Sequence, residues 1–248
     1  LSDLLEIDPN LSVILKRNGH KNIHILINKK FGSVKNFSES IGFNRYVLDN
    51  LLTGRRNVKL KVLIKICKSL NISLEKMTEK IVCTKKPESG FIPLEIFPIK
   101  KDPNLASLVG HSFGDGHVGD SFEYTNKCEE LLNEVNEDVK KLGIKNVKVI
   151  NNRQPDKAPT LIFPKIVRNI FVCAGAPVGN KVTSCYKLPE WIKNGSKGIK
   201  CSFVSALFDD EGNISKTRII RFSMSKRIDL IDNLYLFFKD IETVLESL

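Results

Sequence analysis

The sequence predicts an α+β protein in which an all-α domain precedes a core built from two copies of one α/β unit. Three observations support this prediction. Residues 22–77 carry apolar side chains at helical spacing, with glycine or asparagine between the runs. Residues 83–104 contain four prolines. Residues 105–248 contain one short motif twice, at a separation suited to a repeated structural unit.

Residues 22–77 divide into five predicted helices. Serine and asparagine before a helix accept backbone N–H groups, and glycine after a helix takes the left-handed conformation that ends it. With these signals the helices are placed at 22–31, at 34–41 after Ser33, at 45–52 after Asn44, at 59–70 and from Ile72 onward. A short helix, a turn at a glycine and a helix with a polar first half form the helix-turn-helix arrangement.

The five-helix pattern, with Gly54-Arg55-Arg56-Asn57 after the third helix, resembles the phage-repressor/Cro class over residues 22–80. The resemblance implies double-stranded DNA as a partner. It also implies two groups of contact residues: base edges would be read by Asn44, Arg45, Tyr46 and Asn50, and phosphates would be met by Arg55, Arg56 and Lys59.

The charge distribution favours nucleic-acid binding by this first domain. The chain has 248 residues and a formal charge of +11. Residues 1–86 hold 17 Lys and Arg against 7 Asp and Glu, a net charge of +10, which leaves +1 for the remainder. A basic surface concentrated on one domain is the electrostatic pattern of nucleic-acid binding. A helical adaptor that binds protein is the alternative.

The repeated motif comprises residues 108–118 and 204–214. Each copy predicts an apolar helix ended by glycine, with an acid directly before that glycine: Asp115 in the first copy and Glu211 in the second. Gly110 and Gly114 share one helix face, so a second helix could approach closely and in parallel. Both acids would then meet at the negative ends of two helix dipoles. Such a site favours a hard divalent cation, above all magnesium.

The two motifs resemble those of monomeric LAGLIDADG homing endonucleases. The first copy keeps Leu108, Gly110, Asp115 and Gly116 of the family pattern, and the second keeps Asp209, Glu211 and Gly212. Residues 122–127 and 188–192 extend the resemblance, which covers residue 105 to the end. Two positions depart from the pattern: Phe113 stands where an acid is common, and Asp210 stands where a small interface residue is usual.

This resemblance implies a pseudo-twofold αββαββα core that hydrolyses both strands of double-stranded DNA with Mg²⁺. Asp115 and Glu211 would be catalytic metal ligands, and Lys181 would stabilise charge at the cleaved phosphate. The protein would be monomeric with internal pseudo-symmetry. Two alternatives remain: a non-catalytic DNA-binding regulator on the same scaffold, and an intron maturase that uses the surface on RNA.

The predicted domains are 1–82 for the helix-turn-helix domain, 83–104 for a proline-rich linker, 105–199 for the first repeat and 200–248 for the start of the second. The second repeat is expected to be incomplete, because the 45 residues from Val204 compare with 96 in the first repeat, so further residues beyond Leu248 or a partner chain should complete it. An apolar face left exposed on this repeat is therefore expected. No apolar run approaches the ~20 residues of a membrane span, and the six scattered cysteines indicate reduced thiols and a cytoplasmic location.

Overall fold

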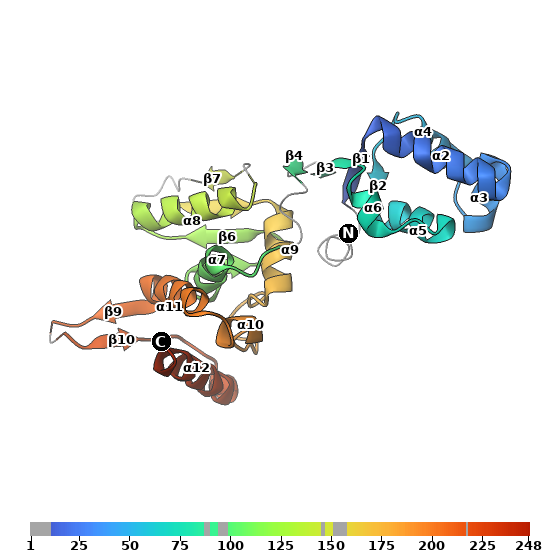
Figure 1. The fold of residues 1–248 in the computed structure, drawn as a ribbon. Coiled ribbons are helices and arrows are strands. Elements are labelled where there is room, and N and C mark those ends of the chain that lie inside the picture. Colours follow the sequence, from blue (N-terminus) through green and yellow to red (C-terminus); the bar gives the residue numbers. More distant parts are fainter. Residues whose placement is uncertain (1–10, 87–89, 94–98, 145–146, 151–157, 217) are drawn as a thin grey trace. The chain divides into compact units, whose positions relative to one another are not determined.

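The computed structural model describes residues 11–86, 90–93, 99–144, 147–150, 158–216 and 218–248, in two compact units, 1–98 and 99–248 (Figure 1). The division lies inside the segment 83–104 that was expected to connect two domains. No helix of the described residues is long and apolar enough to cross a membrane. No disulfide joins the six cysteines, all of which lie in the described ranges.

The described residues of the first unit form five helices and one antiparallel sheet. Its elements in chain order are β1 (Ser12–Leu15), α2 (Arg17–Phe31), α3 (Val34–Ile41), α4 (Arg45–Leu52), β2 (Val58–Lys59), α5 (Leu60–Leu70), α6 (Leu74–Thr78), β3 (Ile81–Lys86) and β4 (Gly90–Pro93). The sheet order is β2-β1-β3-β4. Apolar side chains of the helices form the core of this unit, among them Ile23, Ile27, Phe37, Leu48 and Leu63, all with 0% exposure.

The predicted helix boundaries of this unit follow the capping residues. Ser33 Oγ accepts the backbone N–H of Asn36 at 3.1 Å, and Asn44 Oδ1 accepts that of Tyr46 at 2.8 Å. Gly42 ends α3 with φ of 65° and ψ of 35°. Only α2 begins well before its predicted start. The Lys16 N–H donates to the carbonyl oxygen of Lys80 at 2.7 Å, a tertiary contact that fixes the entry of the chain into this helix.

Part of the segment predicted as a proline-rich linker forms strands. Residues 83–86 belong to β3, which pairs with both β1 and β4. Pro93 is the last residue of β4 and lies opposite Cys83. Pro93 ends an edge strand of the described sheet, which is where proline occurs in sheets. Residues 87–89 and 94–98 of the expected linker lie outside the described residues.

The second unit opens with the predicted αββαββα order. Its first repeat consists of α7 (Pro103–Phe113), β5 (Gly116–Val118), β6 (Phe122–Thr125), α8 (Glu129–Lys141), β7 (Lys148–Ile150), β8 (Thr160–Phe163) and α9 (Lys165–Ala174). The four strands form one antiparallel sheet of order β5-β6-β8-β7. Helix α7 begins at the cap residue Asp102, whose Oδ1 accepts the Leu105 N–H at 2.9 Å. Every residue from Leu105 to Phe113 is buried, so α7 is the central helix of this unit.

The second repeat is shorter. After α10 (Glu190–Lys193) it consists of α11 (Lys197–Glu211), β9 (Gly212–Ile214), β10 (Ile220–Phe222), the 3-10 turn η2 (Ile228–Leu230) and α12 (Ile231–Glu246). Strands β9 and β10 pair only with each other among the described residues (Figure 1). Each motif glycine opens the first strand of its hairpin, and the register places Gly116 opposite Tyr124 and Gly212 opposite Phe222.

Helices α7 and α11 make the most extensive helix–helix contact in the described chain. A Cβ added to Gly110 would lie 2.6 Å from the carbonyl oxygen of Phe203 and 2.9 Å from Cβ of Ala206. A Cβ on Gly114 would lie 2.4 Å from Cβ of Asp210. Because these contacts advance in the same direction along both helices, the pair is parallel. The glycine face therefore permits the close approach that the sequence predicted.

Aromatic side chains of α7, α11 and α12 pack against one another and join the two repeats. The ring of Phe113 stacks on Phe237 of α12 with centroids 5.1 Å apart, and it meets Phe203 of α11 edge-on at 5.6 Å. Phe113 is fully buried. Its position, where the resembled family often has an acid, is thus part of the core of this protein.

The exposed apolar face predicted for the second repeat is present in the described residues. Phe208, Phe222, Tyr235, Phe238 and Leu245 line a groove of about 560 Å³, with the aliphatic part of Lys239 and its neighbours. Tyr235 is 61% exposed and Ile220 of β10 is 65% exposed. The corresponding hairpin of the first repeat is covered by β8 and α9.

Candidate functional site

Two acidic side chains lie where α7 and α11 end. Asp115 follows α7, and Glu211 is the last residue of α11. The residues directly before them, Gly114 and Asp210, lie against each other. The C-terminal ends of both helices, with their negative dipole ends, therefore meet at one place. The structure brings Asp115 and Glu211 together as the repeated motif predicted.

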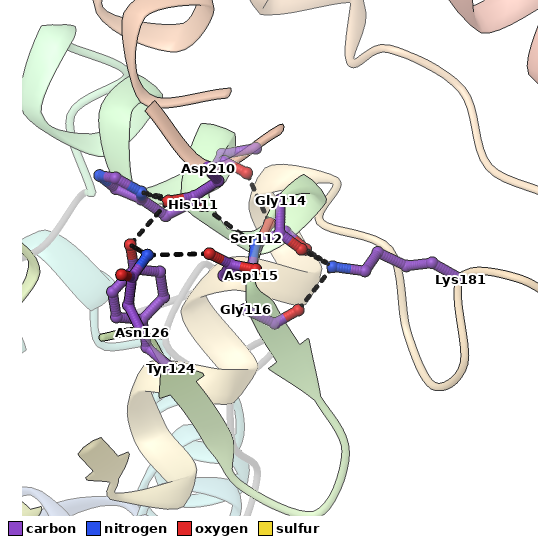
Figure 2. Close-up of polar contacts among 10 residues, drawn as sticks. His111, Ser112, Gly114, Asp115, Gly116, Tyr124, Asn126, Lys181 and Asp210 are labelled. Atoms are coloured by element: carbon purple, nitrogen blue, oxygen red, sulfur yellow. Dashed lines mark hydrogen bonds and ion pairs between the residues drawn. The ribbon is translucent and has the colours of Figure 1, made fainter. Parts of the chain in front are cut away.

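Hydrogen bonds hold Asp115 at its backbone and at its side chain (Figure 2). The Asp115 N–H donates to Oδ2 of Asp210 at 3.0 Å. The amide of Asn126 donates to Oδ2 of Asp115 at 2.8 Å. Asn126 is itself fixed, because its Oδ1 accepts the N–H of Cys128 at the start of α8 at 2.8 Å. The first acid of the site thus has a defined orientation.

The Asp210 side chain is completely buried and fully hydrogen-bonded. The hydroxyl of Tyr124 donates to its Oδ1 at 2.6 Å, and Nδ1 of His111 lies 3.1 Å from both carboxylate oxygens. A buried carboxylate is tolerated only with such partners. No role was predicted for Tyr124, Asn126 or His111. Tyr124 lies on β6 and Asn126 directly follows its last residue, so the two polar side chains are two residues apart in an extended segment, a signal that could have identified them.

Lys181 places a positive charge at the same helix end. Its Nζ donates to the carbonyl oxygens of Gly114, of Gly116 at 2.8 Å and of Ser112 at 3.4 Å (Figure 2). The loop that carries it is anchored, because Lys226 Nζ donates to the Lys181 carbonyl oxygen at 2.9 Å. Lys181 is therefore a half-buried member of the site rather than an exposed loop residue.

Burial and the neighbouring charges shift the pKa values of these groups. Burial raises the pKa of the Asp115 carboxyl, the charge of Asp210 raises it further, and Lys181 opposes both effects. Burial also raises the pKa of Glu211, where Lys181 again opposes the shift and Asp115 adds to it. Burial lowers the pKa of Lys181, while the acids around it act in the opposite direction. A further cation would relieve this repulsion between the carboxylates.

The donor atoms fit magnesium better than a transition metal. Asp115 and Glu211 offer oxygen donors, which Mg²⁺ prefers. No cluster of three or more His, Cys, Asp or Glu side chains suited to a metal occurs in the described ranges. Two protein carboxylates with water and phosphate oxygens form a common magnesium shell. His111 is unsuited as a ligand here, because its ring is 1% exposed and its Nδ1 faces Asp210.

The first unit presents a second candidate surface at α4. Arg45 and Tyr46 open this helix and are exposed, Tyr46 by 60%. Arg45 Nε lies 3.5 Å from Oδ2 of Asp49, and the guanidinium of Arg56 lies 5.8 Å from the centroid of the Tyr46 ring. Arg55, Arg56 and Lys59 are exposed after α4. The exposed cations thus lie at the end of α4 at which phosphate contacts were predicted.

Two of the predicted base-reading residues have structural roles. Asn44 is exposed, but its side-chain oxygen is the N-cap of α4. Asn50 is only 8% exposed, and its amide donates to the Tyr46 carbonyl oxygen at 2.8 Å. The expectation that Asn50 faces base edges is wrong for this structure, because its side chain turns toward the body of the domain.

Comparison with known proteins identifies the domain that carries the surface at α4. Residues 22–76 match the family described as the Cro/C1-type HTH DNA-binding domain. The chain carries a helix-turn-helix DNA-binding domain. The match begins at the predicted boundary, residue 22, and it includes α3, the turn at Gly42 and α4. The match supports DNA binding by this domain, and α4 is the helix that the helix-turn-helix fold presents for it.

Similarity to curated proteins is confined to small parts of those proteins. The chain is 26% identical over 182 residues to a tRNA-splicing ligase RtcB of Methanopyrus kandleri, across 64% of this chain and 18% of the relative. It is 30% identical over 161 residues to a replication factor C small subunit of Methanocaldococcus jannaschii, across 58% of this chain and 9% of the relative. A tRNA-splicing ligase RtcB of the same organism is 30% identical over 186 residues, with 64% and 19% covered. The chain thus spans less than a fifth of the length of these relatives.

Proposed function

We propose that this protein is a site-specific DNA endonuclease of the LAGLIDADG type, which hydrolyses phosphodiester bonds of both strands with magnesium. The observation that carries the proposal is the meeting of Asp115 and Glu211 at the ends of two parallel, closely packed helices. Packing alone does not require an acid at this point in each motif copy. Two carboxylates with raised pKa values beside a half-buried lysine are typical of a site built for charge chemistry.

Each part of the site has a role in this reaction. Asp115 and Glu211 would hold the cation, which when bound activates water and stabilises the leaving oxygen. Lys181 would balance the negative charge of the phosphate under attack. The helix-turn-helix domain would hold the duplex through phosphate contacts and leave the chemistry to the second unit.

The similarity to differently named relatives is consistent with this proposal. The matches to the ligase and to the replication factor subunit each cover more than half of this chain, so the matched stretches overlap. A segment that recurs as a minor part of differently named proteins is a transferable module. This agrees with the resemblance to homing endonucleases and gives no reason to transfer the activity of the ligase or of the replication factor to the chain.

The proposal is tested by incubating the protein with a randomised duplex library and magnesium and sequencing the cut ends. We expect one preferred site, and cleavage there that falls more than about 100-fold in Asp115→Asn and in Glu211→Gln, since even indirect metal partners are worth about 10–100-fold. Asp209→Asn is the matched control, because this exposed acid lies two residues before Glu211. Binding of both acid variants to the selected duplex should persist. Full cleavage in either variant would contradict the assignment.

A non-catalytic DNA-binding regulator is the second candidate function. It is favoured by the matched DNA-binding domain, together with a second unit in which Lys181 already offsets part of the carboxylate charge. This candidate predicts selective binding of a duplex without cut ends at any magnesium or manganese concentration. The library experiment therefore separates the two functions.

The contribution of the first unit can be measured in the full-length chain. Neutralising two phosphate contacts by Arg55→Ala with Arg56→Ala should lower the slope of log affinity against log salt by about 2, at roughly 0.9 for each contact. Lys76→Ala with Lys80→Ala removes the same charge outside α4 and its following turn and is the control. An unchanged slope in the arginine variant would place the DNA elsewhere on the protein.

A further inference from the structure

The position before each motif acid is occupied differently in the two copies. It is Gly114 in the first and Asp210 in the second. A Cβ on Gly114 would lie 2.4 Å from both Cβ and Oδ2 of Asp210. Only one of these matching positions can carry a side chain, and Asp210 fills the space that Gly114 leaves. The helix pair is therefore asymmetric at the place nearest to the two acids.

The Asp210 carboxylate is hydrogen-bonded to Asp115, the acid of the other repeat, both directly and through other side chains. Its Oδ2 accepts the N–H of Asp115, and its Oδ1 accepts the Tyr124 hydroxyl (Figure 2). The Tyr124 oxygen in turn accepts from the amide of Asn126 at 3.3 Å, and that amide donates to Asp115. Asp115 is thus fixed at its backbone directly by Asp210 and at its carboxylate through Tyr124 and Asn126.

Glu211 lacks an equivalent network. The residue opposite its motif glycine is Phe222, where the first repeat has Tyr124. Phe222 stacks on Phe208 with ring centroids 5.1 Å apart and offers no hydroxyl. Two residues later Met224 stands where the first repeat has Asn126. In the described part of the chain no hydrogen bond from another side chain holds the Glu211 carboxylate.

We infer that Asp210 is a positioning residue for Asp115, and that it makes the two acids unequal so that the strand served by Asp115 is cut first. This inference rests on the proposed endonuclease function. A carboxylate held in one orientation needs no reorganisation before it binds the cation, whereas Glu211 must be oriented during the reaction. Cleavage should therefore pass through a duplex nicked in one particular strand.

The test follows both strands of the selected duplex, labelled at their two 5′ ends with different fluorophores, with enzyme in excess over DNA. Two further duplexes, each already nicked in one strand, report the remaining cut alone. The wild type should accumulate one nicked species. Asp210→Asn and Tyr124→Phe should slow the cut of that strand at least about tenfold, which is the lower range for partners that orient a metal ligand. Both variants should change the rate of the other cut by less than twofold. Asp209→Asn and Tyr235→Phe, which alter an exposed acid and an exposed tyrosine, are the controls.

The outcomes are distinguishable. Equal slowing of both cuts, or no change in either, would overturn the positioning role and leave the proposed endonuclease function intact. Simultaneous cutting of both strands by the wild type would do the same. Failure of the wild type to cut any duplex would overturn both proposals. Should Asp210→Asn fail to fold, as judged by its melting curve, Tyr124→Phe decides the question, because it removes only one hydroxyl.

Discussion

The two repeats share the end of the motif helix and differ in nearly everything around it. In the first repeat, four strands and two helices surround α7, and the side chain of Asn126, directly after β6, holds its acid. In the second, a two-stranded hairpin and α12 leave a groove of aromatic residues open beside α11. The position of the acids thus depends on the contact between α7 and α11. The surroundings of each acid depend on the rest of its own repeat.

The largest expected effect is on the free energy of unfolding. It compares substitutions in the helices that follow the two hairpins, α8 and α12. Val135 in α8 has 0% exposure, so Val135→Lys buries a charge without a partner and should destabilise the second unit by about 3–5 kcal/mol. Tyr235 in α12 is 61% exposed and lines the open groove, so Tyr235→Lys should change the free energy of unfolding by less than about 0.5 kcal/mol. Urea denaturation followed by circular dichroism measures both.

The same groove should bind an apolar dye. Tyr235→Lys should lower the fluorescence of such a dye and any self-association seen by light scattering, because it places a charge on the exposed aromatic face. Lys200→Tyr, which adds a ring outside the groove, is the control. If Tyr235→Lys destabilised the protein as much as Val135→Lys, the groove would be closed in solution and the contrast between the repeats would be lost.

A second effect, of intermediate size, tests the equivalence of the motif helices. Gly110 and Ala206 occupy matching positions and touch each other. Gly110→Ala would bring a methyl group within 2.6 Å of the Phe203 carbonyl oxygen, which should cost about 1–3 kcal/mol. Ala206→Gly opens space and should cost about 1 kcal/mol. The double variant moves the methyl group from one helix to the other. If the repeats are equivalent at this contact, the double variant should be destabilised by less than the sum of the two single substitutions.

Much of the helical framework could be predicted because its signals are local. Ser33 and Asn44 cap their helices as expected, and Gly110 lies at the contact that its missing side chain suggested. The network around Asp210 could not be predicted, since its partners Asp115 and Tyr124 are 95 and 86 residues away in the chain. A departure from a family pattern shows that a position is unusual but does not reveal which groups it meets.

Other errors have the same origin in tertiary contacts. The proline content of residues 83–104 suggested a linker, yet pairing with β1 draws residues 81–86 into a strand. Asn50 has a residue type suited to reading bases, but the packing of α4 turns it inward. Sequence patterns describe what one segment prefers alone, and these residues are placed by segments distant in the chain.

The smallest expected effect concerns the pKa values of the two acids. Burial raises the pKa of Asp115 and of Glu211, so the folded chain without metal binds protons at these groups more readily than the unfolded chain does. The stabilisation that these groups contribute is fully present below their pKa values in the unfolded chain, about 3.9 for Asp and 4.3 for Glu. This stabilisation is lost as the pH rises through the higher pKa values of the two acids in the folded chain. At pH 7 without divalent metal, Asp115→Asn and Glu211→Gln should therefore each raise the melting temperature slightly, and the gain should vanish near pH 4.

Magnesium should reverse the order of these melting temperatures. A cation that binds only the folded protein stabilises it according to its concentration and affinity, and the wild type alone keeps both carboxylates. Thermal denaturation at pH 7 with and without magnesium, repeated at pH 4, measures both effects, and Asp209→Asn should behave as the wild type. A fall in melting temperature for both acid variants without metal would mean that Lys181 already compensates the two charges. The acids of the two repeats would then form a structural ion cluster, and the case for a cation site between them would fail.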